Sequence, residues 1–224
     1  MSGEAAGWAE IVRRYGERNG LNYEQVGGIN PKDGPVALCV GGTNRLTGLL
    51  WENTEFWGAC CDADEREVGG LLHKEVVPGA VLAKAHMPDL AEVVPAFNVE
   101  SVEGAEERVI QRLGRKVEFE SIDFNRRYMA TVPSEYDPVA LRELFSPGFL
   151  AWVTSIDNVV DFGINDRQLW FLWSLRERTE AELKEALRNG GQLFSRLRAE
   201  MEESGIHAYP PGPWFAGLEP FPAG

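Results

Sequence analysis

The apolar positions of this 224-residue chain follow two periods, and each period predicts one kind of element. Near both ends, apolar residues recur every three or four positions, which predicts helices over residues 4–18 and 177–204. The apolar stripe of the second helix consists of Leu183, Leu187, Phe194, Leu197 and Met201. Gly190 and Gly191 lie on the path of that stripe, so the helix either breaks there or packs its backbone closely on a sheet.

Short apolar runs between turn residues predict several strands between residues 35 and 62. A two-residue turn at Asn53-Thr54 would pair two of them as a hairpin, and a longer loop is the alternative. The two-residue turn would gather on one face Leu46, Leu50, Trp57 and Cys61. Such a face is apolar enough to belong to a core.

A second hairpin is predicted over residues 158–173, where Asn165-Asp166 tolerate the positive φ that a two-residue turn needs. In this register Phe162 would lie opposite Leu169. Both residues would then contribute to one apolar face of the sheet.

The stretch between these regions predicts two strands, over residues 118–122 and 126–132, joined by a tight corner at Asp123-Phe124-Asn125. Two helices are predicted to follow, beginning at Asp137-Pro138 and at Ser146-Pro147. Proline is favoured in the first turn of a helix because its missing N–H would have no intrahelical partner there.

Together these elements predict an α+β fold in which a mostly antiparallel sheet is covered by N-terminal, middle and C-terminal helices. The alternative is a pleckstrin-homology-like barrel closed by the C-terminal helix. Residues 1–207 are expected to form a single domain, or two lobes divided near residues 94–106. Residues 208–224 form a tail with too many prolines for regular structure.

Composition restricts the classes of function. The net charge of −13 argues against a nucleic-acid partner, because binding to phosphates needs a positive surface. The chain has no run of about 18 apolar residues that would span a membrane. The first 20 residues contain no apolar signal segment. We therefore expect a cytoplasmic protein with no membrane partner, whose oligomeric state stays open.

Residues that hold metals or form disulfides are few and scattered. The cysteines are Cys39, Cys60 and Cys61. The histidines are His73, His86 and His207. Adjacent cysteines on a strand point to opposite faces, and the histidines lack the spacing of metal ligands. We therefore expect no metal, no other cofactor and no disulfide.

Two groups of residues are candidates for binding. Asn125, Arg126 and Arg127, with Glu120 and Asp123 nearby, form either an anion or carboxylate site or a corner held by arginine–carboxylate pairs. The structural interpretation is favoured, because strand alternation sends the two arginines to opposite faces.

The second group is in the tail, where Trp214 and Phe215 follow stiff proline-rich backbone. Large aromatic residues are costly to leave in water, so the tail packs either on its own domain or in the groove of a protein partner. An apolar surface patch is the other route to such a partner.

No phosphate-binding loop, dinucleotide-binding glycine pattern or serine nucleophile motif is present, so the sequence assigns no catalytic residue and leaves enzymatic activity undecided. The favoured function is that of a non-catalytic binding, adaptor or assembly protein. The alternative is a small-molecule-binding or hydrolytic enzyme with a pocket between sheet and helix.

The central stretch also resembles an uncharacterised family of proteins from high-GC Gram-positive bacteria and their phages, which share the signature Glu-Ser-x-x-Phe-Asn-Arg-Arg-Phe/Tyr. The matching residues are Glu120, Ser121, Phe124, Asn125, Arg126, Arg127 and Tyr128. Weaker similarity covers Gly20, Leu21 and Tyr23, residues 48–62, and residues 87–90. No activity is established for that family. Its members often carry transmembrane helices, so the missing apolar run keeps a membrane role from being carried over.

Overall fold

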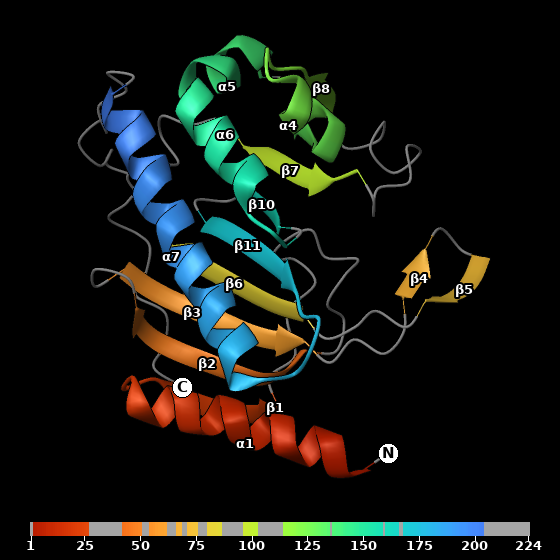
Figure 1. Ribbon diagram of the computed structural model, residues 1–224, viewed down its shortest axis with the longest axis vertical. Coiled ribbons are helices and arrows are strands. Elements are labelled where there is room, and N and C mark those ends of the chain that lie inside the picture. Colours follow the sequence, from red (N-terminus) through yellow and green to blue (C-terminus); the bar gives the residue numbers. More distant parts are fainter. Residues whose placement is uncertain are drawn as a thin grey trace, which may run out of the picture.

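A large antiparallel sheet, with helices packed against it, forms the body of the protein in this computed structural model (Figure 1). The structure describes residues 2–26, 42–50, 54–61, 66–68, 71–75, 80–86, 96–102, 114–134, 136–158, 160–165 and 168–203.

Nine strands form this sheet in the order β1-β2-β3-β6-β11-β10-β7-β9-β8, and each neighbouring pair is antiparallel. They are β1 (Asn22–Val26), β2 (Gly42–Leu50), β3 (Thr54–Cys61), β6 (Ala80–His86), β7 (Phe97–Ser101), β8 (Arg115–Val117), β9 (Tyr128–Val132), β10 (Val160–Asn165) and β11 (Gln168–Ser174). Two further strands, β4 (Arg66–Val68) and β5 (Leu71–Glu75), pair with each other.

Among the described strands, β1 and β8 each have a neighbour on one side only, so the sheet is open. The α+β prediction is therefore confirmed, and the barrel alternative is wrong. The two-lobe division stays a prediction, although β7 lies within the proposed boundary and pairs with both β10 and β9. The proposed tail, residues 208–224, lies outside the described residues.

The helices are α1 (Ser2–Arg18), α4 (Ile122–Arg127), α5 (Pro138–Leu144), α6 (Pro147–Ser155) and α7 (Glu180–Glu203). The two proline-led starts are confirmed. Asp137 caps α5 by accepting a hydrogen bond from the Val139 N–H, and Ser146 caps α6 by accepting one from the Phe149 N–H. The caps fix the first residue of each helix. Figure 1 shows α5 and α6 one after the other near β7.

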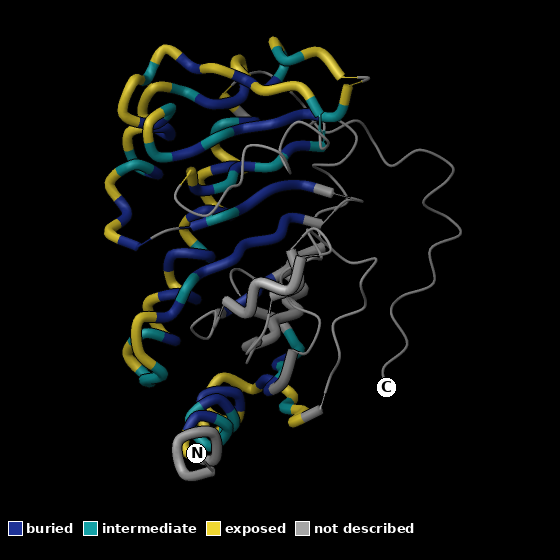
Figure 2. Tube along the Cα trace, turned by 90° about the vertical axis from the view of Figure 1, so that its right-hand side faces the viewer, coloured by how far each residue is buried: buried dark blue, intermediate teal, exposed yellow. Residues whose placement is uncertain are grey.

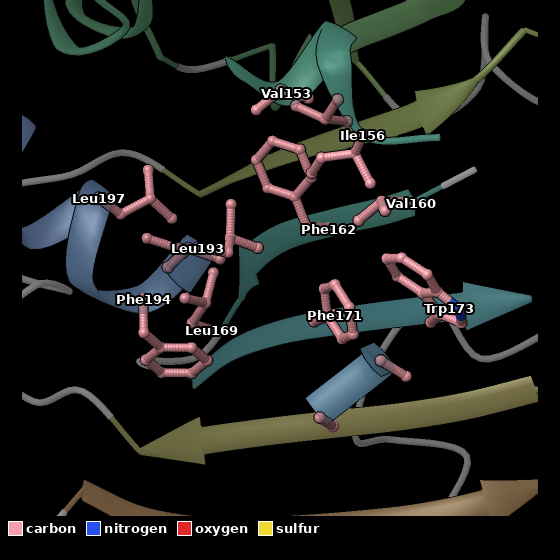
Figure 3. Packing of buried hydrophobic residues seen from close by; sticks show 14 of the residues in the cluster. Val153, Ile156, Val160, Phe162, Leu169, Phe171, Trp173, Leu193, Phe194 and Leu197 are labelled. Atoms are coloured by element: carbon pink, nitrogen blue, oxygen red, sulfur yellow. The ribbon is translucent and has the colours of Figure 1, made fainter. Parts of the chain in front are cut away.

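The core lies between the helices and one face of the sheet. Figure 3 shows Leu193, Phe194 and Leu197 of α7 beside strand β11, which carries Leu169 and Phe171. Phe97 of β7 and Phe162 of β10 meet edge to face, with ring centroids 6.2 Å apart. Figure 2 shows burial running along the described central strands, while the outer sides of the helices are exposed.

Helix α7 runs unbroken through Gly190 and Gly191, so the alternative of a break there is wrong. Close packing of these glycines on a sheet stays a prediction. Gly190 is buried, and Asn189 before it is only 8% exposed. The helix therefore turns its glycine-containing side toward the protein.

Helix α1 packs beside α7 and against β1 and β2. A Cβ atom on Gly16 would lie 2.6 Å from Leu46 Cδ2, so a side chain at this position would require the Leu46 side chain to move. Arg18 of α1 forms a 2.8 Å ion pair with Glu180 at the start of α7. The first and last described helices are thus joined at the surface as well as in the core.

The expected register of the β2–β3 hairpin is wrong. Leu50 pairs with Thr54 and Leu46 with Gly58, so the loop is longer than two residues. The difference is an odd number of positions, so the expected pairing of Leu46 with Cys61 and of Leu50 with Trp57, on which the predicted shared face depended, is wrong.

The register of the β10–β11 hairpin also differs from the expected one. Phe162 pairs with Phe171, and Asn165 pairs with Gln168. The shift is two residues, so Phe162 and Leu169 still share a face, as predicted. An even shift changes which side chains touch and leaves the composition of the core unchanged.

Candidate functional site

The signature region is built around the short helix α4, not around a corner between two strands, so that part of the prediction is wrong. The Ser121 hydroxyl accepts a hydrogen bond from the Phe124 N–H at 3.3 Å, which caps the start of α4. β9 then begins at Tyr128. Phe124 and Tyr128 are both buried, and their rings lie 5.3 Å apart.

Asn125 holds the chain on the N-terminal side of α4. Its Nδ2 donates to the Phe119 carbonyl at 2.6 Å, and its Oδ1 accepts from the Phe119 N–H at 3.2 Å. One side chain thereby satisfies both backbone groups of a largely buried residue. The Phe119 ring in turn meets the Phe124 ring edge to face at 5.2 Å. Asn125 therefore fastens Phe119 into the core.

Arg127 joins α4 to the end of α6. Its guanidinium donates to the Thr154 carbonyl at 2.6 Å and to the Asn158 carbonyl at 3.0 Å. Thr154 lies in the last turn of α6, where carbonyl groups lack intrahelical partners and the helix dipole favours a cation. The Arg127 guanidinium also lies 5.5 Å from the centre of the Tyr128 ring.

The other predicted site residues are not part of this arrangement. Arg126 and Glu120 are exposed, and within the described part of the chain neither side chain has a hydrogen-bond or ion-pair partner. Trp214 and Phe215 lie outside the described residues. The structure thus gives Asn125 and Arg127 roles in holding the fold, and it leaves Arg126 and Glu120 at the surface.

The residue after Arg127, Tyr128, has a buried hydroxyl near the charges of Arg127 and Asp161. The Tyr128 side chain is 1% exposed, and its hydroxyl lies beside the backbone of Val160 without a hydrogen bond of ordinary geometry. Burial raises the pKa of this hydroxyl, and the positive charge of Arg127 opposes part of that shift. Asp161 accepts a 2.7 Å hydrogen bond from the Ser101 N–H, which ties β10 to β7.

One contact that local sequence does not reveal connects α6 and α7. The Glu200 carboxylate accepts hydrogen bonds from the Ser146 N–H at 3.0 Å and from the Ser146 hydroxyl at 2.8 Å. The partners are 54 positions apart, so no local pattern marks them as neighbours.

The described residues include neither a cluster of metal ligands nor a helix that could span a membrane. There, no group of three or more His, Cys, Asp or Glu side chains could hold a metal ion. Within the same ranges, every helix is too short or too polar to cross a membrane.

The architecture defines a class: an open antiparallel sheet with helices packed on it, α+β throughout. No protein-family model matches the chain, and no curated protein matches it significantly. Among solved structures, the fold is similar to that of the mycobacterial trehalose monomycolate transport factor A, TtfA. The TM-score is 0.51 at 15% sequence identity, and the match covers 92% of this chain and 98% of that chain. At this identity, the likeness shows a shared fold.

Proposed function

We propose that this protein is a non-catalytic accessory protein that binds a protein partner as an adaptor or assembly factor. The observation that carries the proposal is the fold shared with TtfA along nearly the whole of both chains, because that protein is named as a transport factor. A cytoplasmic location belongs to the same proposal. So does membership in the uncharacterised family with the signature at residues 120–128.

The roles of the polar residues support a binding protein over an enzyme. Asn125 and Arg127 are the main binding-site candidates from the sequence, and their side chains form hydrogen bonds with backbone groups of the fold. Glu200 does the same at the start of α6. A catalytic side chain must be able to contact the substrate, whereas the polar groups of these side chains contact the protein itself.

The alternative enzyme would need a pocket between sheet and helix. In the described part of that layer, apolar side chains of α7 and β11 pack against each other (Figure 3).

The proposed function is tested by isolating partners of the tagged full-length chain from the organism that encodes it, then repeating each interaction with purified proteins. We expect a stoichiometric complex that forms without substrate or nucleotide. A Trp214→Ala/Phe215→Ala variant reports whether the tail contributes to it. Turnover of a small molecule by the purified chain, with no partner that survives purification, would contradict the proposal.

A further inference from the structure

Helix α6 and the middle of α7 lack acidic residues, although the chain as a whole is acidic. Of the 224 residues 35 are acidic, and the net charge is −13. Yet neither residues 147–155 nor residues 186–199 contain an acidic residue. The second stretch carries Arg188, Arg196 and Arg198, all of which are exposed. A positive region therefore exists on a strongly negative protein.

The three arginines are spread across the exposed half of α7. Arg188, Gln192 and Ser195 recur at intervals of four and three residues, so they line the middle of the exposed side. Arg196 and Arg198 flank that line on either side. The middle of the face is uncharged apart from Arg188, so the positive charge is spread around small and polar side chains.

Helix α6 extends this face, as Figure 1 shows α6 and α7 side by side. The Arg196 guanidinium lies 4.7 Å from the centre of the half-exposed Trp152 ring of α6. The neighbouring Gly148, Ala151 and Ser155 are exposed and small. We define the α6–α7 surface by its six principal residues: Trp152, Arg188, Gln192, Ser195, Arg196 and Arg198.

Two of the arginines have no role in holding the fold. Among the described residues, neither Arg188 nor Arg198 has a hydrogen-bond or ion-pair partner. Basic residues of α1 and of the first turns of α7 are paired in contrast: Arg13 with Glu10 and Glu17, and Lys184 with Glu180. A partly buried tryptophan in contact with an arginine combines two residue types that are enriched at protein interfaces.

We infer that the α6–α7 surface docks an acidic segment of a partner protein. The inference rests on the proposed function and names the site and the charge of its partner. Anionic lipid fits less well, because polybasic membrane sites contain about four to eight basic residues. This surface has three arginines on a chain of net charge −13, which an anionic bilayer repels.

The test replaces Gln192 with a photo-crosslinking amino acid in the full-length chain, expressed in the organism that encodes it. We expect a crosslink to a protein whose crosslinked peptide is net negative. Arg188→Glu/Arg198→Glu should reduce the yield at least tenfold, because the variant repels that peptide. Arg14→Glu/Arg126→Glu makes the same change in net charge at exposed arginines outside the surface and should leave the yield unchanged.

If the charge-reversed variant fails to fold, salt gives a second measurement on the unsubstituted surface. Raising NaCl from about 0.05 M to about 0.5 M should reduce the crosslinking yield at least tenfold, because the Debye length shortens severalfold. Crosslinks to lipid, to a second copy of this chain or to a net-positive peptide would overturn the inference. So would a yield that neither charge reversal nor salt changes.

A second crosslinker, at Phe215, separates the two claims. Capture of a protein from position 215 but not from position 192 would overturn the assignment of the α6–α7 surface and leave the proposed function standing. Capture from neither position, together with failure to isolate a complex, would count against both.

Discussion

Glu200 of α7 holds the first turn of α6 through Ser146, whose N–H and hydroxyl both donate to its carboxylate. The carboxylate lies at the positive end of the α6 dipole, where a negative charge is favourable. Ser146 also caps the helix through the Phe149 N–H at 3.1 Å. One residue of the last described helix thus fixes where α6 begins.

Glu200→Ala should lower the free energy of unfolding by about 1–3 kcal/mol, because it removes two charge-assisted hydrogen bonds. Urea denaturation followed by circular dichroism measures the change. Glu203→Ala, an exposed acid in the same turn region of α7, serves as the control and should cost less than about 0.5 kcal/mol. Equal losses in the two variants would show that the Ser146 contact does not stabilise the fold.

The signature arginines should differ sharply in their effects. Arg127→Ala removes donors to Thr154 and Asn158 and should lower the free energy of unfolding by about 1.5–3 kcal/mol. Arg126→Ala should change it by less than about 0.5 kcal/mol, because Arg126 is exposed and lacks a partner among the described residues. The two variants control for each other in the same denaturation experiment, and a reversed order would refute the assignment.

The sequence predicted those elements whose signals are local. Asp137 and Ser146 cap their helices through bonds that span two or three residues, so the residue pattern itself contains the evidence. The stripe of α7 was visible for the same reason, since its period is repeated over several turns.

The prediction of a corner between two strands at Asp123-Phe124-Asn125 was wrong because the local residue pattern is ambiguous. Phe124 and Tyr128, four residues apart, share a face in a helix and in a strand alike. The Ser121 cap and the two hydrogen bonds between the Asn125 side chain and the Phe119 backbone stabilise the helix at this position. The sequence singles out Arg127, but the backbone partners that give Arg127 its role in the fold lie 27 and 31 positions away.

Tyr128 should make stability depend on pH in the alkaline range. Burial raises the pKa of its hydroxyl in the folded state above the ordinary value of about 10. The contribution of the protonated Tyr128 hydroxyl to the free energy of unfolding is therefore fully present below about pH 10. It is lost as the pH rises through the raised pKa of the folded state. Tyr15 is also buried with a raised pKa, and it should add to the same loss.

Tyr128→Phe should therefore lose less stability than the unsubstituted chain between about pH 9 and about pH 11, as measured by urea denaturation at each pH. At neutral pH the change should be small, because the buried hydroxyl lacks an ordinary hydrogen bond. Tyr136→Phe is the control, since Tyr136 is 41% exposed. Parallel pH profiles for Tyr128→Phe and the unsubstituted chain would contradict the assignment.

Gly163 on β10 is the position least able to accept a side chain near the centre of the sheet. An added Cβ would lie 2.2 Å from the Phe97 carbonyl oxygen and 2.8 Å from Trp170 Nε1. Gly163→Ala should therefore separate β10 from β7 and lower the free energy of unfolding by at least about 2 kcal/mol.

Gly148→Ala is the matched control, because a Cβ there would meet only Ser146 Oγ, at 3.6 Å. In α6 that exchange should stabilise the protein by about 0.5–1 kcal/mol. Thermal and urea denaturation of both variants measures the contrast, and a Gly163→Ala protein as stable as the unsubstituted chain would show that β7 and β10 are not this closely paired.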